Sequence, residues 1–207
     1  GGGQGRGRGR PASDRVQRLL APVVHVAHAG AGAQAHAQAD GRQRHAVECQ
    51  LVHHRPALLA HEMAPDLVIV GEEVMTTQGE LLCYFITELI PPYLSPEEAC
   101  ERVHAQGGII GPSHPFDPRR SGLGRNNLLR IAEKIDFIEV FNARTYDKSK
   151  NDLAHQLAEE LDKPMICCSD AHTLKEIGVS RTCLHRDYTS PQDFLVALRE
   201  ADYEATF

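Results

Sequence analysis

The chain contains 207 residues, of which 42% are hydrophobic and 24% are charged, and its formal net charge is -6. These values are typical of one soluble globular domain, and the negative charge disfavours partners recruited by bulk positive charge, such as nucleic acid or acidic lipid. No apolar run is long enough to cross a membrane and the start lacks the apolar segment of a secretory signal, so we expect a cytoplasmic protein without membrane contact.

Residues 1–64 differ in composition from the rest of the chain. They contain no Lys, Asn, Ile, Phe, Tyr or Thr, and they hold seven of the twelve histidines. The Gly/Arg tract at residues 1–10 cannot bury enough apolar surface to offset its ordering entropy, so we expect disorder there, with weak RNA binding as a less favoured alternative. Beyond it we find no sustained helical or strand period, and one hypothesis is a GC-rich gene translated in the wrong frame up to about residue 64.

Apolar runs alternate with helical patterns from Pro65 onward. This alternation predicts βα units around a parallel sheet, and hence an α/β domain over residues 65–207. The first apolar run, at residues 67–70, is followed by Gly71 and then by Glu72 and Glu73. We therefore expect a strand that ends in two carboxylates.

Four helices are expected in the same domain. Residues 95–98, Ser-Pro-Glu-Glu, combine an N-cap serine, a proline at the first helical position and a glutamate that can close a capping box, and the helix should stop at the Gly107–Gly108 pair. The other helices are expected at residues 127–133, at residues 148–162 and from Ser190 onward.

Three later strands repeat the design of the first, because each is an apolar run that turns polar. They are expected at residues 108–111, 135–142 and 164–168. In a parallel barrel the residues that follow the strands meet on one face, although they are far apart in sequence. The polar residues brought together in this way are Glu73, His114, Asn142, Asp170 and His172.

Imidazole nitrogen and carboxylate oxygen without a thiolate suit Zn, Mn or Fe in a hydrolytic centre rather than a structural zinc site. Such an ion lowers the pKa of bound water and holds phosphate oxygens, and either Glu72 or Glu73 could bridge two ions. Each residue also has a purely structural interpretation: His114 as a turn cap, Asp170 and His172 as an Asx-turn and a surface imidazole. Their joint occurrence at separate strand ends favours the metal centre.

Three arginines follow the candidate ligands in sequence. Arg119 and Arg120 lie in the loop after His114, and Arg144 follows Asn142. A guanidinium beside a metal centre can hold a substrate phosphate through two parallel hydrogen bonds, whereas the alternative is that these are solvated loop charges. We expect Arg119, Arg120, Asn142 and Arg144 to contact substrate.

Several motifs together resemble the PHP family, the polymerase and histidinol phosphatase group of metal-dependent phosphoesterases. The resemblance covers about residues 65–207 and is carried by Gly71-Glu72-Glu73, Ile90-Pro91-Pro92 with Ser95-Pro96-Glu97-Glu98, Ser113-His114-Pro115-Phe116-Asp117, Glu139-Val140-Phe141-Asn142-Ala143-Arg144 and Ser169-Asp170-Ala171-His172. It implies a distorted barrel of seven βα units, a cluster of up to three divalent ions, and hydrolysis of phosphate esters.

By position in those motifs, the resemblance implies that Glu73 bridges ions, that His114 is another ligand, and that Asp170 and His172 form the closing Asp-x-His pair. Asn142 stands where relatives carry a ligand or a group that contacts substrate. Asp170 and His172 are thus the residues we expect to be catalytic.

The family's opening His-x-His pair is missing. Residues 25–28 read His-Val-Ala-His, which is one residue too wide, because only residues i and i+2 of a strand point to the same face. The first strands of the barrel are therefore expected to be absent or degraded, leaving an incomplete barrel that holds fewer ions. The leading hypothesis is a phosphoesterase that attacks a small molecule, nucleotide or short oligonucleotide with metal-activated water, and the alternative is a non-catalytic remnant.

Overall fold

The structure is a computed structural model that describes residues 57–65 and 68–205. The expectations for the Gly/Arg tract and for His25 and His28 lie outside the described residues. Residues 57–63 form a helix, in which Ala57 is fully buried. The Nδ1 atom of His61 in this helix lies 2.7 Å from the carbonyl oxygen of Val68.

A three-stranded antiparallel sheet begins the described domain. It consists of β1 (Gly71–Met75), β2 (Glu80–Tyr84) and β3 (Ile109–Pro112), in the order β1-β2-β3. The expectation of a parallel sheet was wrong for this part of the chain. Only four residues, 76–79, join β1 to β2, whereas a parallel connection needs a crossover of a dozen or more.

The first strand also lies later in the sequence than expected. Residues 68–70 are buried but are not in a strand, and β1 begins at Gly71, where an added Cβ would lie 2.4 Å from the carbonyl oxygen of Cys83. Glu73 pairs with Leu82 in the middle of β1 rather than at its end. Because side chains alternate along a strand, Glu72 and Glu73 point to opposite faces of the sheet.

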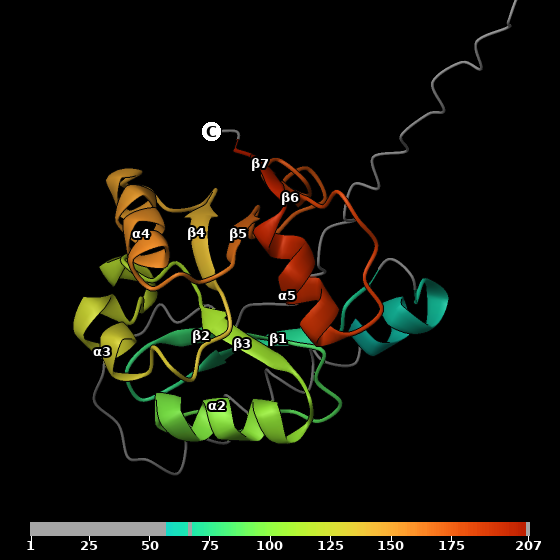
Figure 1. The fold of residues 1–207 in the computed structure, drawn as a ribbon, viewed down its shortest axis with the longest axis horizontal. Helices are drawn as coiled ribbons and strands as arrows, with labels where there is room; N and C mark the ends of the chain where they lie inside the picture. Colours follow the sequence, from blue (N-terminus) through green and yellow to red (C-terminus); the bar gives the residue numbers. More distant parts are fainter. Residues whose placement is uncertain (1–56, 66–67, 206–207) are drawn as a thin grey trace, which may run out of the picture.

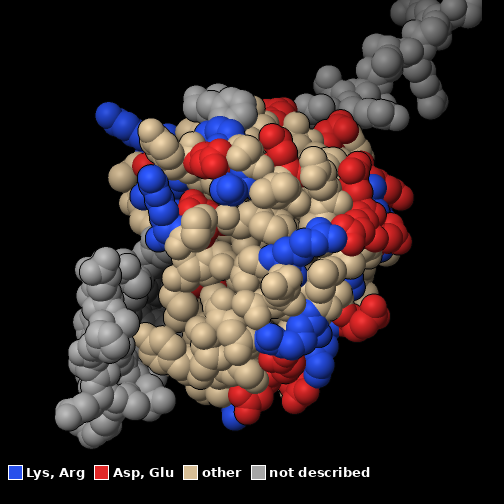
Figure 2. Space-filling view, turned by 90° about the vertical axis from the view of Figure 1, so that its left-hand side faces the viewer, with Lys and Arg blue, Asp and Glu red and all other residues tan. Residues whose placement is uncertain are grey.

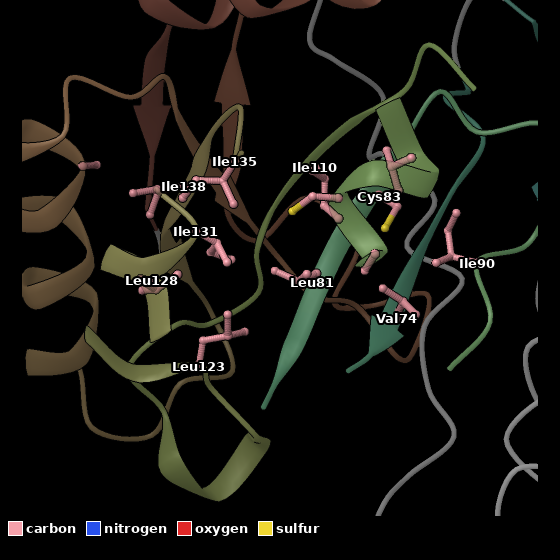
Figure 3. Packing of buried hydrophobic residues seen from close by; sticks show 14 of the residues in the cluster. Val74, Leu81, Cys83, Ile90, Ile110, Leu123, Leu128, Ile131, Ile135 and Ile138 are labelled. Atoms are coloured by element: carbon pink, nitrogen blue, oxygen red, sulfur yellow. The ribbon is translucent and has the colours of Figure 1, made fainter. Parts of the chain in front are cut away.

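Helix α2 (Pro96–Ala105) covers one of those faces (Figure 1). The expected capping box is confirmed: the Ser95 side chain accepts a hydrogen bond from the Glu98 backbone, and the Glu98 carboxylate accepts one from the Ser95 backbone. The helix buries Ala99, Cys100 and Val103 against the sheet. Figure 3 shows the residues of this cluster that β1, β2 and β3 contribute, Val74, Leu81, Cys83 and Ile110.

The expected βαβ unit is confirmed in the second half. Strand β4 (Ile138–Asn142) runs parallel to β5 (Met165–Cys168), and α4 (Ser149–Glu160) connects them. Asn142 pairs with Cys168, so the carboxyl ends of both strands lie at the same edge. Asp170 follows β5 directly, which is why it lies near Asn142.

Helix α3 (Gly124–Arg130) begins and ends three residues earlier than expected, because residues 131–134 form a turn rather than a continuation. A short 3₁₀ element, η1 (Pro118–Arg120), precedes it in the loop after β3. The C-terminal part contains β6 (Arg181–Cys183), the expected helix α5 (Pro191–Arg199), and β7 (Asp202–Glu204), which pairs with β6.

Individual hydrogen bonds link the three sheets, of which the β4–β5 sheet stands above the antiparallel sheet in Figure 1. Ile110 of β3 donates its N–H to Asp136 Oδ2 over 2.8 Å, and the Asp136 N–H donates to the Ile110 carbonyl over 2.8 Å. At the other side, the Cys167 N–H donates to Thr182 Oγ1 over 2.8 Å. A second apolar cluster lies on the face of the antiparallel sheet that points away from α2, which we call its inner face, and it includes Leu82, Tyr84, Phe137, Ile166 and Phe194.

The surface beside α3 and α4 mixes positive and negative side chains (Figure 2). Three exposed ion pairs lie on α2, α3, α4 and the turn after α3: Arg125–Glu160, Arg130–Glu97 and Lys134–Glu101. Exposed pairs of this kind contribute little stability, but they leave no broad basic surface on this face. Within the described part of the chain, no helix is both long and apolar enough to cross a membrane.

Candidate metal centre

Two carboxylates and an imidazole meet on the inner face of the antiparallel sheet. Glu73 pairs with Leu82, and Met75 pairs with Glu80, so Glu73 and Glu80 lie diagonally opposite on the same face. His114 follows β3, and its Nε2 lies 3.1 Å from Glu73 Oε1 and 3.3 Å from Glu80 Oε2. Donor atoms of these three residues, which we call the carboxylate–imidazole cluster, all lie within 4.8 Å of one another.

The cluster is buried, and the protonation of each of its side chains depends on the charge of the others. The His114 side chain is 0% exposed. Burial disfavours its charged form, but hydrogen bonds with Glu73 and Glu80 outweigh burial and raise the pKa of His114 to about 10. Burial also raises the pKa of Glu80, while the hydrogen bond with His114 opposes that rise. Without another cation, a proton on His114 therefore balances the two carboxylates.

A second set of side chains lies at the ends of β4 and β5. Asn142 Nδ2 donates to Asp170 Oδ2 over 3.1 Å, and Arg120 donates to both: from Nη1 to Asn142 Oδ1 over 2.9 Å, and from Nη2 to Asp170 Oδ2. We call Arg120, Asn142 and Asp170 the Asp170 group. Asp170 and Asn142 are almost fully buried, at 3% and 1% exposure.

Glu139 connects the two sets. Its Oε2 accepts a hydrogen bond from the His114 backbone N–H, and its Oε1 accepts one from Asn142 Nδ2 over 3.1 Å. A register shift in β4 lies between Glu139 and Phe141. Irregularities of this kind re-aim side chains near functional sites. The carboxylate–imidazole cluster and the Asp170 group therefore belong to one hydrogen-bonded network.

His172 lies beside Asp170. Its Nδ1 lies 2.9 Å from the Asp170 carbonyl oxygen and 3.7 Å from Asp170 Oδ1. Its backbone N–H donates to Glu176 Oε2 over 2.7 Å. Of the four predicted ligands, Glu73 and His114 are thus in direct contact, Asp170 and His172 form a second pair, and Glu139 with Asn142 joins the pairs.

The backbone is strained at both of these pairs. His114 has a φ of 28° and Asp170 a φ of 50°, which is the left-handed region that residues other than glycine rarely adopt. Such conformations cost on the order of 1–3 kcal/mol each and concentrate at binding and catalytic sites. The strain sets the directions in which the His114 and Asp170 side chains point.

The three predicted arginines have different surroundings. Arg120 contacts the network directly through its hydrogen bonds with Asn142 and Asp170. Arg144 donates its backbone N–H to Asn142 Oδ1 over 3.0 Å, while its guanidinium Nη1 bonds Glu176 over 3.2 Å. Arg119 places its guanidinium 5.3 Å from the centre of the Tyr146 ring. Only Arg120 reaches the buried carboxylates through its guanidinium.

Residue chemistry alone left either Glu72 or Glu73 as the bridging carboxylate, whereas the family resemblance implied Glu73, and in the structure it is Glu73 that contacts His114. Glu72 lies on the face opposite the cluster, where its Oε1 accepts a hydrogen bond from the Ile90 N–H over 2.7 Å. Burial raises its pKa to about 7, although the hydrogen bond from Ile90 opposes the rise. The carboxylate that joins Glu73 is instead Glu80, which the sequence reading missed.

Glu80 and Glu139 had detectable signals in the sequence. Glu80 directly precedes the apolar run of β2, and a reading of residues 76–79 as a hairpin turn would have set it on the same face as Glu73. Glu139 is an acidic residue inside an otherwise apolar strand. A buried carboxylate in such a run needs a partner, which itself suggests a site.

The donor set suits a divalent cation. Two buried atoms of the predicted ligands, His114 Nδ1 and Asp170 Oδ1, have no hydrogen-bond partner within the described residues. Proteins rarely leave buried polar atoms in this state, and coordination to a cation is one way in which such an atom is satisfied. Carboxylate oxygen with imidazole nitrogen is the ligand chemistry of Zn, Mn or Fe.

Comparison with known proteins gives both sequence and fold relatives. The sequence model of a family described as PHP-associated matches residues 148–203. One uncharacterized protein of Methanocaldococcus jannaschii is 37% identical over 156 residues, which are 70% of this chain and 66% of that protein. A second from the same organism is 39% identical over 102 residues, 48% of this chain and 57% of that protein. The chain thus spans less than two thirds of the second relative and about two thirds of the first.

Solved structures share the fold. One is a two-domain protein of Bacteroides vulgatus that contains a predicted PHP-like metal-dependent phosphoesterase. It superposes with a TM-score of 0.58 at 19% sequence identity, and the match covers 74% of this chain and 50% of that protein. PsfC of Pseudomonas syringae gives 0.51 at 23% identity, covering 67% and 59%. A Bifidobacterium adolescentis protein assigned as a metal-dependent phosphoesterase gives 0.50 at 14% identity, covering 70% and 80%.

Proposed function

Because this chain belongs to the PHP family, we propose that it is a metal-dependent phosphoesterase that hydrolyses phosphate esters. The observation that carries the proposal is the single buried network that joins the carboxylate–imidazole cluster to Asp170 through Glu139 and Asn142. Buried ligand atoms without hydrogen-bond partners among the described residues, on both His114 and Asp170, support a bound cation.

The proposed ligands are Glu73, His114, Asp170 and His172, with Glu80 as a further carboxylate in the cluster. A divalent ion held by such a set lowers the pKa of bound water and neutralises phosphate oxygens. Asp170 and His172 are the residues that we propose act in catalysis. Ligands that lie in two linked sets are compatible with more than one ion.

Arg120, Asn142, Arg119 and Arg144 are the proposed contacts to substrate. The guanidinium of Arg120 reaches the network and can form paired hydrogen bonds with a phosphate, which is the geometry that favours Arg over Lys. The substrate class is a phosphate ester of a small molecule, a nucleotide or a short oligonucleotide. We further propose a cytoplasmic location and a distorted, incomplete barrel of the (βα)7 type in which the first strands are absent or degraded.

The test measures hydrolysis of an aryl phosphate with added Mn²⁺, comparing the wild type with Asp170→Asn. Asparagine tolerates the left-handed backbone at this position, so the variant should fold while losing a ligand charge. Its kcat/KM should fall by at least about 100-fold, because even residues that only support a ligand are worth about 10–100-fold. Asp152→Asn, on the exposed side of α4, is the matched control. Equal activity of wild type and Asp170→Asn would refute the assignment.

The non-catalytic remnant is the second candidate, because the sequence contains no His-x-His pair at residues 25–28. Metal analysis distinguishes the two. A folded protein that retains less than one ion per chain after loading with Mn²⁺ or Zn²⁺ favours the remnant. One or more bound ions, lost in Glu73→Gln but kept in Glu72→Gln, favour the enzyme.

A further inference from the structure

The geometry points to Arg120 as an internal cation that competes with a divalent ion for Asp170. Loading the Asp170 side of the centre then requires the guanidinium to release that carboxylate. The inference rests on the proposed function, and it assigns this arginine a role in regulating metal occupancy in addition to substrate contact.

The first support is the contact itself. Arg120 forms an ion pair with Asp170 through Nη2 and donates from Nη1 to Asn142 Oδ1 over 2.9 Å. The Asp170 side chain is only 2% exposed, and a carboxylate this deeply buried is very unfavourable without a counter-charge. In the absence of a metal ion, Arg120 supplies that counter-charge. A divalent ion bound to Asp170 would supply it instead.

The second support is the difference in anchorage. Asn142 and Asp170 are at the ends of two packed parallel strands, whereas Arg120 comes from η1, a three-residue 3₁₀ element in the loop after β3. The Arg120 side chain is 18% exposed, so part of it already contacts solvent, whereas the Asp170 side chain is almost fully buried. The carboxylate is therefore fixed, and the cation is the partner that can move.

The third support is the unused ligand atom on Asp170. Oδ2 accepts hydrogen bonds from both Asn142 and Arg120, while Oδ1 is buried and has no hydrogen-bond partner among the described residues. An incoming ion at Oδ1 would be repelled by a guanidinium still bound to Oδ2, since the two positive charges would share one carboxylate. The two cations therefore exclude one another.

A released guanidinium remains close to the centre and is available for a phosphate. If Arg120 leaves Asp170 and binds the substrate phosphate instead, metal loading and phosphate binding are linked.

The test measures Mn²⁺ affinity by titration calorimetry, and thermal unfolding with and without Mn²⁺, for wild type and Arg120→Gln. Removal of a competitor should tighten Mn²⁺ binding by about tenfold, within the usual range of coupling between ligands at linked sites. The metal-free variant should melt at a lower temperature than wild type, and Mn²⁺ should raise its melting temperature by more than it raises that of wild type.

Arg125→Gln is the matched control. It removes the same charge from α3, together with an exposed ion pair that Arg125 forms with Glu160 of α4. It should leave Mn²⁺ affinity unchanged. Arg120→Lys, which keeps the positive charge but cannot bridge Asn142 and Asp170 in the same way, should show an intermediate affinity. It serves as the deciding variant if Arg120→Gln does not fold.

Unchanged or weaker Mn²⁺ binding in folded Arg120→Gln, or in Arg120→Lys where that variant decides, would overturn the competition while leaving the proposed function intact. Failure of the wild type to bind Mn²⁺ would overturn both. The two failures are therefore distinguishable within one set of titrations.

Discussion

At the scale of single residues, the chain illustrates how two adjacent glutamates acquire different environments. Glu73 faces the inner side of the sheet, where His114 and Ser113 contact it. Glu72 faces the loop that contains Ile90, and one of its oxygens, Oε2, is buried without a hydrogen-bond partner among the described residues. The alternation of a strand thus gives one carboxylate to the candidate centre and leaves the other as an isolated buried acid.

Glu72→Gln should stabilise the protein at pH 8. The folded-state pKa of Glu72 is raised by burial from 4.5 to about 7, so the folded protein binds the proton more tightly than the unfolded chain. The contribution of the protonated Glu72 carboxyl to the free energy of unfolding is therefore fully present below pH 4.5 and is lost as the pH rises through 7. Ionisation at pH 8 costs roughly 3 kcal/mol at most, and a neutral isostere avoids that cost.

Urea unfolding at pH 4 and pH 8 checks this prediction. We expect a gain of about 1–3 kcal/mol at pH 8 and little change at pH 4. Glu133→Gln, at an exposed position, should show neither effect. An equal effect of Glu72→Gln at both pH values would show that folding does not raise the pKa of this carboxyl.

At the scale of elements, the hairpin of β1 and β2 and the capped helix α2 show two different origins of local structure. The capping box of α2 is encoded within four consecutive residues, and it forms where those residues predict it. The strands behave differently. β1 lies several residues later than the apolar run at residues 67–70, because pairing with β2 sets where β1 begins and ends. Helix starts are local, whereas strand ends depend on the partner.

Ser95→Ala should destabilise the domain by about 1 kcal/mol, because the helix loses the side-chain acceptor for the Glu98 N–H. Ser95→Thr, which keeps the hydroxyl, should cost less. Chemical denaturation of the three proteins gives the comparison. Since α2 covers the face opposite Glu73, Mn²⁺ affinity should not change. A loss of affinity in Ser95→Ala would show that α2 supports the centre.

At the scale of the whole molecule, the candidate centre depends on how closely two sheets meet. His114 follows the antiparallel sheet, while Glu139 and Asp170 belong to the parallel one. Gly111 of β3 lies against the segment that leads into β4, where an added Cβ would approach the Phe137 carbonyl oxygen to 2.5 Å. Only glycine permits the approach that allows Glu139 to accept a hydrogen bond from His114.

Gly111→Ala should therefore reduce stability and metal binding together. The added methyl group forces the sheets apart, at a cost of about 1–3 kcal/mol for an overpacked site. Gly107→Ala is the control, because no atom lies within 4 Å of its added Cβ and only the left-handed φ of 77° is unfavourable. It should lower stability without changing Mn²⁺ affinity. Unaltered affinity in Gly111→Ala would mean that sheet contact does not position the ligands.

The sequence by itself determined the features that a few neighbouring residues encode. These are the starts of α2 and α5, the parallel βαβ unit that ends at Asn142 and Asp170, and the polar side chains that follow its strands. Each depends on caps, apolar periods or turn residues that act over one or two turns of chain. The motifs that carry the PHP resemblance belong to the same local level.

The tertiary structure alone decided which side chains meet. Pairing in the β1–β2 hairpin put Glu73, which the motif resemblance already implied, on one face with Glu80, and the contact between sheets made Glu139 the link to Asp170. Arg120 reached Asp170 across 50 positions of sequence, a contact with no local signal. Register and sheet packing are set by long-range contacts, which is why strand pattern alone left these choices open.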